Sequence, residues 1–346
     1  MEVNIHIKHL SVGYPNPSST AKGIILPPID ASLAPGELVA LVGRNGIGKS
    51  TFLRTLVGLQ PAIDGLIEIN DKPLYAYKKD ELSRMVGFVS TDISRIPHLK
   101  VFDLVSLGRF PYTGWMGRLK VNDKMVIYDA LEMVGLRTMA WRNVDTLSDG
   151  ERQRALIARA LVQDTPVMIL DEPTAYLDVI HKYEVMDLLC QIAHKENKTV
   201  LFSTHDLNIA QDMVDKIWLV TKSELIEGAP EDMIMMSTFE KLVTRTAIRF
   251  NRVGGEFEMG KRLLKTMAVH SRQDIRWIRH ALQRFGYRAI QNPATTPDNT
   301  PELLFEINRN GMRLSYNYGL ERHVFTSVYA LGQYLRNLRN LRTLSK

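Results

Sequence analysis

The sequence contains a single cysteine, Cys190, among its 346 residues. One cysteine cannot form a disulfide within the chain, and we expect Cys190 to be a buried thiol in a helical stretch. No uninterrupted apolar run approaches the roughly 18 residues that a membrane-spanning helix requires. The first residues, 1–4, include no basic segment followed by an apolar core, so we expect no secretory signal. These absences predict a cytosolic protein.

The composition is that of an ordinary soluble globular chain, with 45% hydrophobic and 24% charged residues, long enough for two domains. Its charge is uneven. From residue 251 onward there are 16 Lys and Arg against 7 Asp and Glu, and the remainder has 28 against 31. A basic appendage suggests contact with anionic lipid headgroups, an acidic partner surface or nucleic acid. A solvated basic surface explains the same count.

Residues 43–51 read GRNGIGKST, a loop of the form G-x-x-x-x-G-K-[ST]. An apolar run precedes this loop and a helical pattern follows it, which is the strand–loop–helix setting that the motif requires. The glycines let the backbone curl so that successive N–H groups point at phosphate oxygens, and the helix start adds its positive dipole end. A simple turn is the alternative, which the complete motif disfavours. The predicted nucleotide-binding residues are Gly43, Arg44, Asn45, Gly46, Gly48, Lys49, Ser50 and Thr51.

Two side chains of this loop and two later acids predict the chemistry. We expect Lys49 to reach the β- and γ-phosphates and the Ser50 hydroxyl to ligate Mg²⁺. Residues 167–170 read VMIL, typical of a buried parallel strand, and Asp171 and Glu172 follow at its carboxyl end. Asp171 is predicted to hold Mg²⁺, and Glu172 to polarise water for attack on the γ-phosphate. If only one of these acids were present, an ordinary solvated side chain at the end of a strand would be the simpler interpretation.

The order GRNGIGKST, LSDGERQ, VMILDEP, AYLD and His205 resembles the ATP-binding subunit of ABC transporters. The resemblance implies an α/β fold: a P-loop ABC ATPase domain over 1–260, with an antiparallel β-part, a parallel-sheet core and a helical subdomain over about 92–147. It also implies ATP and Mg²⁺ as cofactors. In this family two copies form a head-to-tail homodimer that sandwiches two ATP molecules.

The signature segment of the family corresponds here to Ser148, Asp149, Gly150 and Glu151, and departs from the common form at its third and fifth positions. The resemblance implies that this segment caps the γ-phosphate held by the partner's loop. The residues agree, because Ser148 precedes a helical pattern whose free N–H groups favour an anion. Asp178 matches the D-loop acid that couples the two sites, and His205, after a strand, matches the switch histidine that contacts the γ-phosphate.

Two further positions have competing interpretations. Tyr14, at the end of a strand, matches the aromatic residue that stacks on adenine, although a space-filling tyrosine is the rival interpretation. Thr91 occupies the position at which the family usually carries a glutamine that touches Mg²⁺ and water. Threonine is shorter, so we expect altered coupling, with hydrolysis retained through Glu172 and His205. Asp92 is a candidate substitute ligand.

Residues 101–119 resemble the corresponding stretch of subunits that serve importers of ferric siderophores, haem and cobalamin. The resemblance implies a separate transmembrane permease subunit, an extracytoplasmic substrate-binding protein acting indirectly, and a peripheral place on the cytoplasmic face of the inner membrane. Phe110, Tyr112 and Trp115 fit either internal packing or docking to the permease.

Two other functions compete with transport. A soluble ABC ATPase acting in DNA repair or on ribosomes could use the basic tail to touch nucleic acid, but the chain has one cassette and no heptads. We therefore consider a nucleic-acid partner the weaker interpretation. A small-molecule kinase sharing only the phosphate loop would lack LSDGERQ and the later histidine.

Patterns elsewhere predict the remaining organisation. Residues 3–12, 38–42 and 65–70 are expected in the antiparallel β-part, and Asn122-Asp123 is expected to cap a helix.

Residues 268–346 predict a small α+β domain of order α-β-β-β-α that regulates or dimerises rather than catalyses. Ser271 begins a capping box, and Asn310-Gly311 centres a hairpin that pairs Phe305 with Tyr316 and Ile307 with Leu314. The first helix ends at Gly286, and a strand is expected over 287–291. The final helix is expected to carry a stripe of Val324, Val328, Leu331, Leu335 and Leu338.

Overall fold

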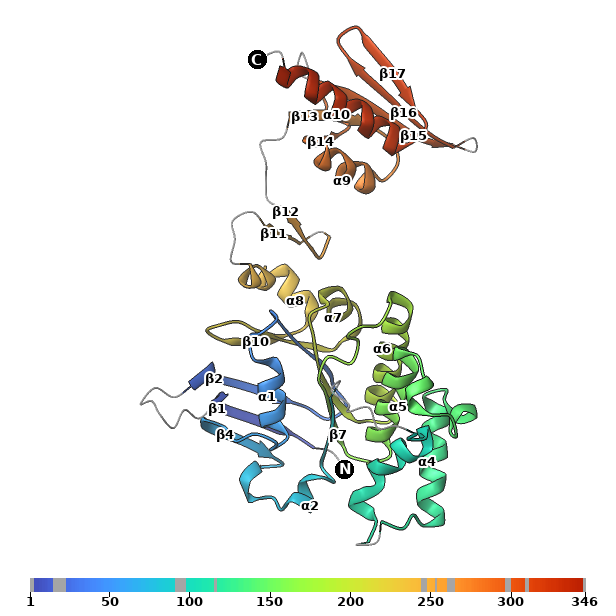
Figure 1. Cartoon of the computed structure of the whole chain (residues 1–346). Helices are drawn as coiled ribbons and strands as arrows, with labels where there is room; N and C mark the ends of the chain where they lie inside the picture. The colour runs from blue at the N-terminus through green and yellow to red at the C-terminus, as the bar shows by residue number, and fades with distance from the viewer. Residues whose placement is uncertain are drawn as a thin grey trace. The chain divides into compact units, whose positions relative to one another are not determined.

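In the computed structural model, the chain divides into two compact units, Met1–Glu258 and Met259–Lys346, with the boundary near the predicted residue 260 (Figure 1). The described residues are 3–14, 23–90, 98–114, 117–243, 248–252, 254–259, 265–295, 300–308 and 311–344. Thr91, Asp92 and Trp115 lie outside them. No helix among the described residues combines the length and apolar character needed to cross a bilayer.

The first unit is built on a six-stranded sheet of order β10-β9-β3-β8-β7-β6, in which β10 pairs antiparallel with β9 and the remaining pairings are parallel. Successive residues of β3 pack into two different hydrophobic clusters, one on each face of the sheet. Leu38, Ala40 and Val42 pack in the cluster of the helical side, whereas Val39 and Leu41 pack in the cluster of the antiparallel sheet. Because both faces are covered, the strand reads as a continuous apolar run. Its strands are β3 (Leu38–Gly43), β6 (Val86–Val89), β7 (Val167–Leu170), β8 (Thr199–Thr204), β9 (Lys216–Val220) and β10 (Leu225–Gly228).

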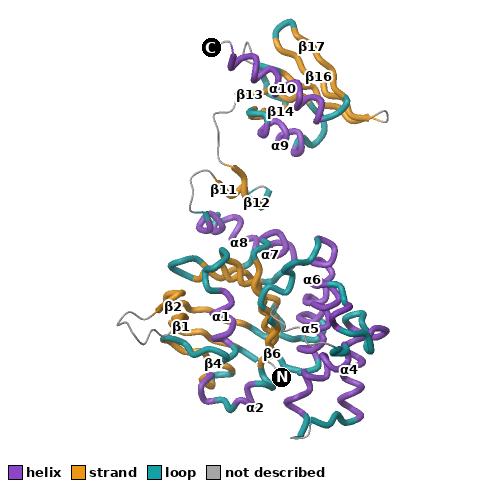
Figure 2. The backbone as a smooth tube through the Cα atoms, viewed as in Figure 1, coloured by secondary structure: helices purple, strands orange, loops and turns teal. Residues whose placement is uncertain are grey.

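Helices α4, α5 and α6 lie together on one side of this sheet, away from β1, β2 and β4 (Figure 2). Residues 98–114 and 117–147, which lie in the predicted helical subdomain, contain α3, α4 and short 3₁₀ turns. The α-helices are α1 (Lys49–Leu56), α2 (Lys79–Leu82), α3 (Val101–Ser106), α4 (Val121–Met133), α5 (Asp149–Leu161), α6 (Val179–His194), α7 (Leu207–Met213) and α8 (Pro230–Met235). The short 3₁₀ turns are η1 (Leu74–Ala76), η2 (Leu107–Tyr112), η3 (Arg137–Met139), η4 (Val144–Thr146) and η5 (Thr238–Leu242).

The antiparallel β-part has the order β2-β1-β4-β5 and differs from the prediction in two ways. Residues 38–42 do not belong to it, because β3 pairs in parallel with β8 and β9. The prediction also missed β2, which contains Pro27-Pro28. These prolines are tolerated because β2 is an edge strand. Its strands are β1 (Ile5–Tyr14), β2 (Gly23–Leu33), β4 (Asp64–Ile69) and β5 (Lys72–Pro73), and a separate pair follows as β11 (Ile248–Asn251) and β12 (Glu256–Met259).

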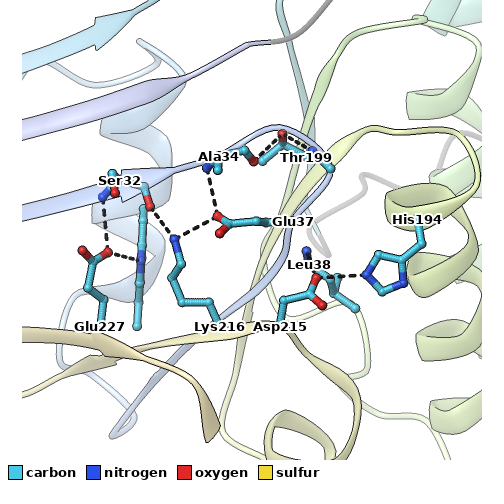
Figure 3. Close-up of polar contacts among 11 residues, drawn as sticks. Ser32, Ala34, Glu37, Leu38, His194, Thr199, Asp215, Lys216 and Glu227 are labelled. Carbon is cyan, nitrogen blue, oxygen red and sulfur yellow. Dashed lines mark hydrogen bonds and ion pairs between the residues drawn. The ribbon is translucent and has the colours of Figure 1, made fainter. Parts of the chain in front are cut away.

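A polar network ties the amino ends of the parallel strands to β2 (Figure 3). The Lys216 ammonium donates to the Ser32 carbonyl at 3.1 Å and to Glu37 Oε2 at 2.9 Å. Glu37 Oε2 also accepts the Ala34 N–H at 2.9 Å. Glu227 Oε2 accepts both the Ser32 N–H and the Trp218 indole N–H, at 3.3 and 3.1 Å. The chain reversal between β2 and β3 is thus fixed at the edge opposite the phosphate loop.

In the second unit, the described residues form a mixed sheet of order β14-β13-β15-β16-β17 and the helices α9 and α10. The core joins Phe305 and Leu314 of the sheet to Ile278, Leu282 and Leu335 of the helices. The predicted α-β-β-β-α order missed the first and last strands. The elements are β13 (Lys265–His270), α9 (Arg276–Arg284), β14 (Tyr287–Gln291), β15 (Glu302–Asn308), β16 (Gly311–Tyr318), β17 (Glu321–Phe325) and α10 (Val328–Leu344).

The predicted hairpin register is wrong by two residues. Phe305 lies opposite Leu314, and Ile307 lies opposite Met312. Asn308 pairs with Gly311, and Asn310 of the predicted turn lies outside the described residues. A slip of two keeps every side chain on its face, so the inward position of Phe305 survives.

Local details of this unit also differ from prediction. Val324 lies in β17 with 56% of its surface exposed, not on the final helix. The Ser271 hydroxyl accepts the N–H of Gln273 and forms a local turn, so no capping box forms. The helix begins at Arg276, whose N–H bonds to Asp274 instead.

Candidate functional site

The phosphate loop and the predicted acids meet at one edge of the parallel sheet. The loop follows β3, and β8 lies between β3 and β7, so the carboxyl ends of all three strands adjoin. Lys49 Nζ lies 3.8 Å from Glu172 Oε1. His205 Nδ1 lies 3.9 Å from Glu172 Oε2. Lys49 and His205, more than 150 positions apart in the sequence, therefore both lie beside the Glu172 carboxylate.

The loop backbone leaves room for a phosphate. Gly48 precedes α1 with φ of 110°, and no side chain caps the helix, so its first N–H groups are available to an anion. A Cβ on Gly48 would lie 2.5 Å from the Ile25 side chain. Gly46 also has positive φ, with no atom within 4 Å of its Cβ position. Both glycines meet a conformational need, as the motif predicts.

Lys49 is buried at the base of the loop, with 5% of its side chain exposed. Its ammonium donates to the carbonyl of Gly43 at 3.0 Å. Burial lowers the pKa of Lys49, and the carboxylates of Glu172 and Asp171 oppose that shift. A triphosphate at this place would supply additional negative charge to a partly desolvated cation. The site therefore fits ATP.

Ser203 holds the two acids in place, and the sequence interpretation missed it. Its hydroxyl donates to Asp171 Oδ1 at 2.7 Å and accepts the Glu172 N–H at 2.8 Å. Ser203 is fully buried in β8. Glu172 itself has a left-handed backbone, with φ of 48°, so this bond supports an unusual conformation. A hydroxyl residue at the carboxyl end of an apolar strand, two residues before His205, was the available signal.

The same residues fit a Mg²⁺ ion carried by the nucleotide. Among the described residues, no group of three or more His, Cys, Asp or Glu side chains could hold a metal. Mg²⁺ at phosphate sites needs less, because it keeps waters and phosphate oxygens and takes one or two protein ligands. Asp171 and Ser50, at the sheet edge and the start of α1, match that donor set; their role stays a prediction.

Ser148 and Glu151 form a capping box at the start of α5. The Ser148 hydroxyl accepts the Glu151 N–H at 3.2 Å, and Glu151 Oε2 accepts the Ser148 N–H at 2.8 Å. This second bond lowers the pKa of Glu151. The unusual fifth signature residue thus has a local structural role, and the helix start predicted after Ser148 is confirmed.

Gly150 of the predicted signature segment lies against His181, which bonds to Asp178, the predicted D-loop acid. A Cβ on Gly150 would lie 2.9 Å from His181 Cδ2, so the glycine rests against that imidazole ring. His181 Nδ1 lies 2.8 Å from Asp178 Oδ2, and the His181 N–H donates to Asp178 Oδ1 at 2.9 Å. These bonds hold the pKa of Asp178 below its usual range. Asp149, beside Gly150, is exposed.

We expect Gly150→Ala to displace the His181 ring and break its bond to Asp178. Overpacking of this kind costs about 1–3 kcal/mol, and we expect ATP turnover to fall about tenfold while ATP binding to the same chain is unchanged. Phosphate release and nucleotide titration measure the two quantities. Gly228→Ala is the matched control, because its Cβ would lie 3.8 Å from Met233, an ordinary contact. Equal turnover in both variants would contradict the contact's importance.

Tyr14 ends β1 with 56% of its surface exposed. Its ring is therefore not filling the core, which was the rival interpretation. Stacking on adenine stays a prediction. Cys190 is half-buried, with its Sγ 3.6 Å from the Met213 carbonyl, and burial raises the pKa of its thiol.

The aromatic patch of the helical subdomain contains both packed and exposed members. Arg109 is buried against Asp123 at 2.9 Å, and its guanidinium lies over the Tyr112 ring. The Tyr112 hydroxyl donates to the Gln163 carbonyl, so this tyrosine packs internally. Phe110 is 74% exposed and is free to contact a partner. Asp123 lies within the first turn of α4 and accepts the Lys120 N–H, a capping role close to the predicted one.

Comparisons with known proteins agree with this geometry. The ABC transporter family model matches residues 26–175. The petrobactin import ATP-binding protein FpuD of Bacillus anthracis is 33% identical over 235 residues, which is 68% of this chain and 84% of that protein. Among solved structures, a metal-chelate type ABC transporter in an inward-facing conformation has a TM-score of 0.60 at 29% identity, covering 69% of this chain and 88% of that one.

A dimeric bacterial ABC transporter cassette is also similar, with a TM-score of 0.57 and 28% identity over 65% of this chain and 98% of the cassette. The range that the family model matches includes the phosphate loop, and the similar structures have the fold of ABC ATPases. The chain belongs to the ABC transporter family and is one of its ATP-binding, ATP-hydrolysing subunits.

Proposed function

We propose that this chain powers an importer of metal chelates, with a ferric siderophore as the first candidate and haem or cobalamin next. The petrobactin import relative and the metal-chelate transporter structure support the substrate class. A soluble ATPase acting on nucleic acid has no comparable support, and a small-molecule kinase does not fit an ABC cassette. The placement of Glu172 beside Lys49 and His205 is the observation that supports ATP hydrolysis most directly.

The reaction follows from the residues at the sheet edge. The phosphate loop and Lys49 hold the β- and γ-phosphates, and Mg²⁺, held by Ser50 and Asp171, would neutralise their charge. Glu172, oriented by Ser203, accepts a proton from the attacking water. His205 orients the γ-phosphate. Asp178 couples this site to the second one.

The second half of each site comes from another copy of the chain. Ser148 is the N-cap of α5 and Gly150 lies in its first turn, where the positive end of the helix dipole suits the γ-phosphate held by the partner's loop. The similar dimeric cassette supports a homodimer. Thr91, at the usual glutamine position, is proposed to alter coupling without abolishing hydrolysis.

The remaining partners complete the assembly. A separate transmembrane permease is proposed to receive the helical subdomain, with exposed Phe110 at the contact. An extracytoplasmic substrate-binding protein acts through that permease. The chain would then sit peripherally on the cytoplasmic face of the cell membrane.

The test is to purify the chain with its permease in lipid vesicles and measure ATP turnover with each chelate. We expect a ferric siderophore, supplied with its binding protein, to raise turnover more than haem or cobalamin. Turnover raised by single-stranded RNA or duplex DNA, with no multi-span subunit co-purifying, would overturn the proposal.

A further inference from the structure

The second unit exposes an arginine-rich helix face around a tryptophan. Helix α9 buries Ile278, Ala281 and Leu282 against its sheet. On the opposite side Trp277 is 79% exposed, with its ring 5.7 Å from that of His280. An exposed indole presents a large apolar ring beside a polar N–H, so covering it would bury a large apolar area.

The charge around this tryptophan has one sign. Between residues 271 and 288 there are five arginines and one acid, Asp274. Asp274 already accepts the backbone N–H of Arg276 at the helix start. Within the part of the chain that the structure describes, none of these five arginines forms an ion pair. The five exposed arginines are Arg272, Arg276, Arg279, Arg284 and Arg288.

This combination matches an anionic phospholipid surface. Arginines attract acidic headgroups, and tryptophan is favoured at the interface, where its apolar ring enters the acyl boundary and its N–H stays in the polar layer. A bilayer presents a broad surface and needs no groove. Single-stranded nucleic acid is usually bound in a groove with several stacking aromatic side chains, whereas α9 presents one large exposed aromatic residue.

We propose that the outer face of α9, comprising Arg276, Trp277, Arg279 and Arg284, binds anionic phospholipid headgroups. The proposal rests on the proposed function in one respect, which is that a permease brings the chain to a membrane. The surface would hold the second unit on the bilayer independently of the ATPase chemistry.

The experiment uses the full chain without permease and two vesicle preparations, one of phosphatidylcholine alone and one of equal parts phosphatidylcholine and phosphatidylglycerol. Flotation measures binding. We expect binding to the anionic vesicles only, weakened by added salt because headgroup attraction is screened. We expect R276Q/R279Q to lose about tenfold or more in apparent affinity. Trp277→Phe should remove part of the lipid-induced blue shift of tryptophan fluorescence.

The matched control is R313Q/R322Q, which removes the same charge from exposed positions of β16 and β17. This control should bind the vesicles nearly as the unchanged chain does, and both double variants should keep their ATP turnover. No binding to anionic vesicles, an equal loss in both double variants, or tighter binding to single-stranded RNA in the same salt would each overturn the proposal. Chelate-stimulated turnover of the assembled transporter reports separately on the proposed function, so the two failures are distinguishable.

Discussion

The Glu172→Gln variant should bind ATP, but its rate of ATP hydrolysis should fall by about a hundredfold or more. The amide keeps the shape of the side chain and its distance from Lys49, so the nucleotide site is preserved. It cannot accept a proton from water, and general base catalysis contributes about 10²–10⁴-fold to rate. Steady-state phosphate release measures the loss, and titration with a fluorescent ATP analogue shows that binding is retained.

Glu184→Gln is the control for this substitution. Glu184 is an exposed acid that pairs with Arg154 at 3.0 Å, and such surface pairs contribute about 0–1 kcal/mol to stability. Its turnover should match that of the unchanged chain. Full activity in Glu172→Gln would show that another group activates the water.

Replacing Lys49 with methionine should weaken ATP binding by about a hundredfold or more. Methionine keeps much of the buried side-chain volume but removes the ammonium that faces Asp171 and Glu172. Those carboxylates would then repel the triphosphate without compensation, and losing one partner of a buried charge pair costs about 2–5 kcal/mol. Titration with the same ATP analogue gives the dissociation constant directly.

Lys8→Met provides the comparison, because Lys8 pairs with Glu68 on the β-part and is 58% exposed. Its ATP affinity should be unchanged. The two variants should also differ in melting temperature without nucleotide, since removing the buried Lys49 cation also removes its desolvation cost. Unaltered ATP affinity in Lys49→Met would contradict the assigned place of the phosphates.

Local patterns predicted the chemistry of the site better than its supports. The glycines, Lys49 and the acids after β7 lie in short motifs, each with a structural setting readable from a few neighbours. Ser203 could not be assigned in advance, because its bonds to Asp171 and Glu172 depend on β7 and β8 being adjacent. The contact of Gly150 with His181 likewise needs the packing of α5 on α6.

The fold errors have the same origin. The strands that pair with each other are determined by the whole sheet. Residues 38–42 were therefore predicted in the antiparallel part, whereas β3 pairs in parallel with β8 and β9. The prediction missed β2 because Pro27-Pro28 argues against a strand. An edge strand tolerates proline, since its N–H groups on the outer side need no strand partner. In the second unit, Val324 continued a helical spacing by chance, although its backbone pairs in β17 with Ser315.

We propose that each ATP is held between two copies of the chain. This arrangement is tested by mixing two forms in the Glu172→Gln background, one with Lys49→Met and one with Ser148→Asp. Aspartate keeps the helix cap but places a negative charge where a phosphate should lie. Neither form alone should retain ATP through gel filtration, whereas their mixture should retain one nucleotide per pair of chains. A mixture that retains no more ATP than its separate components would contradict the shared site.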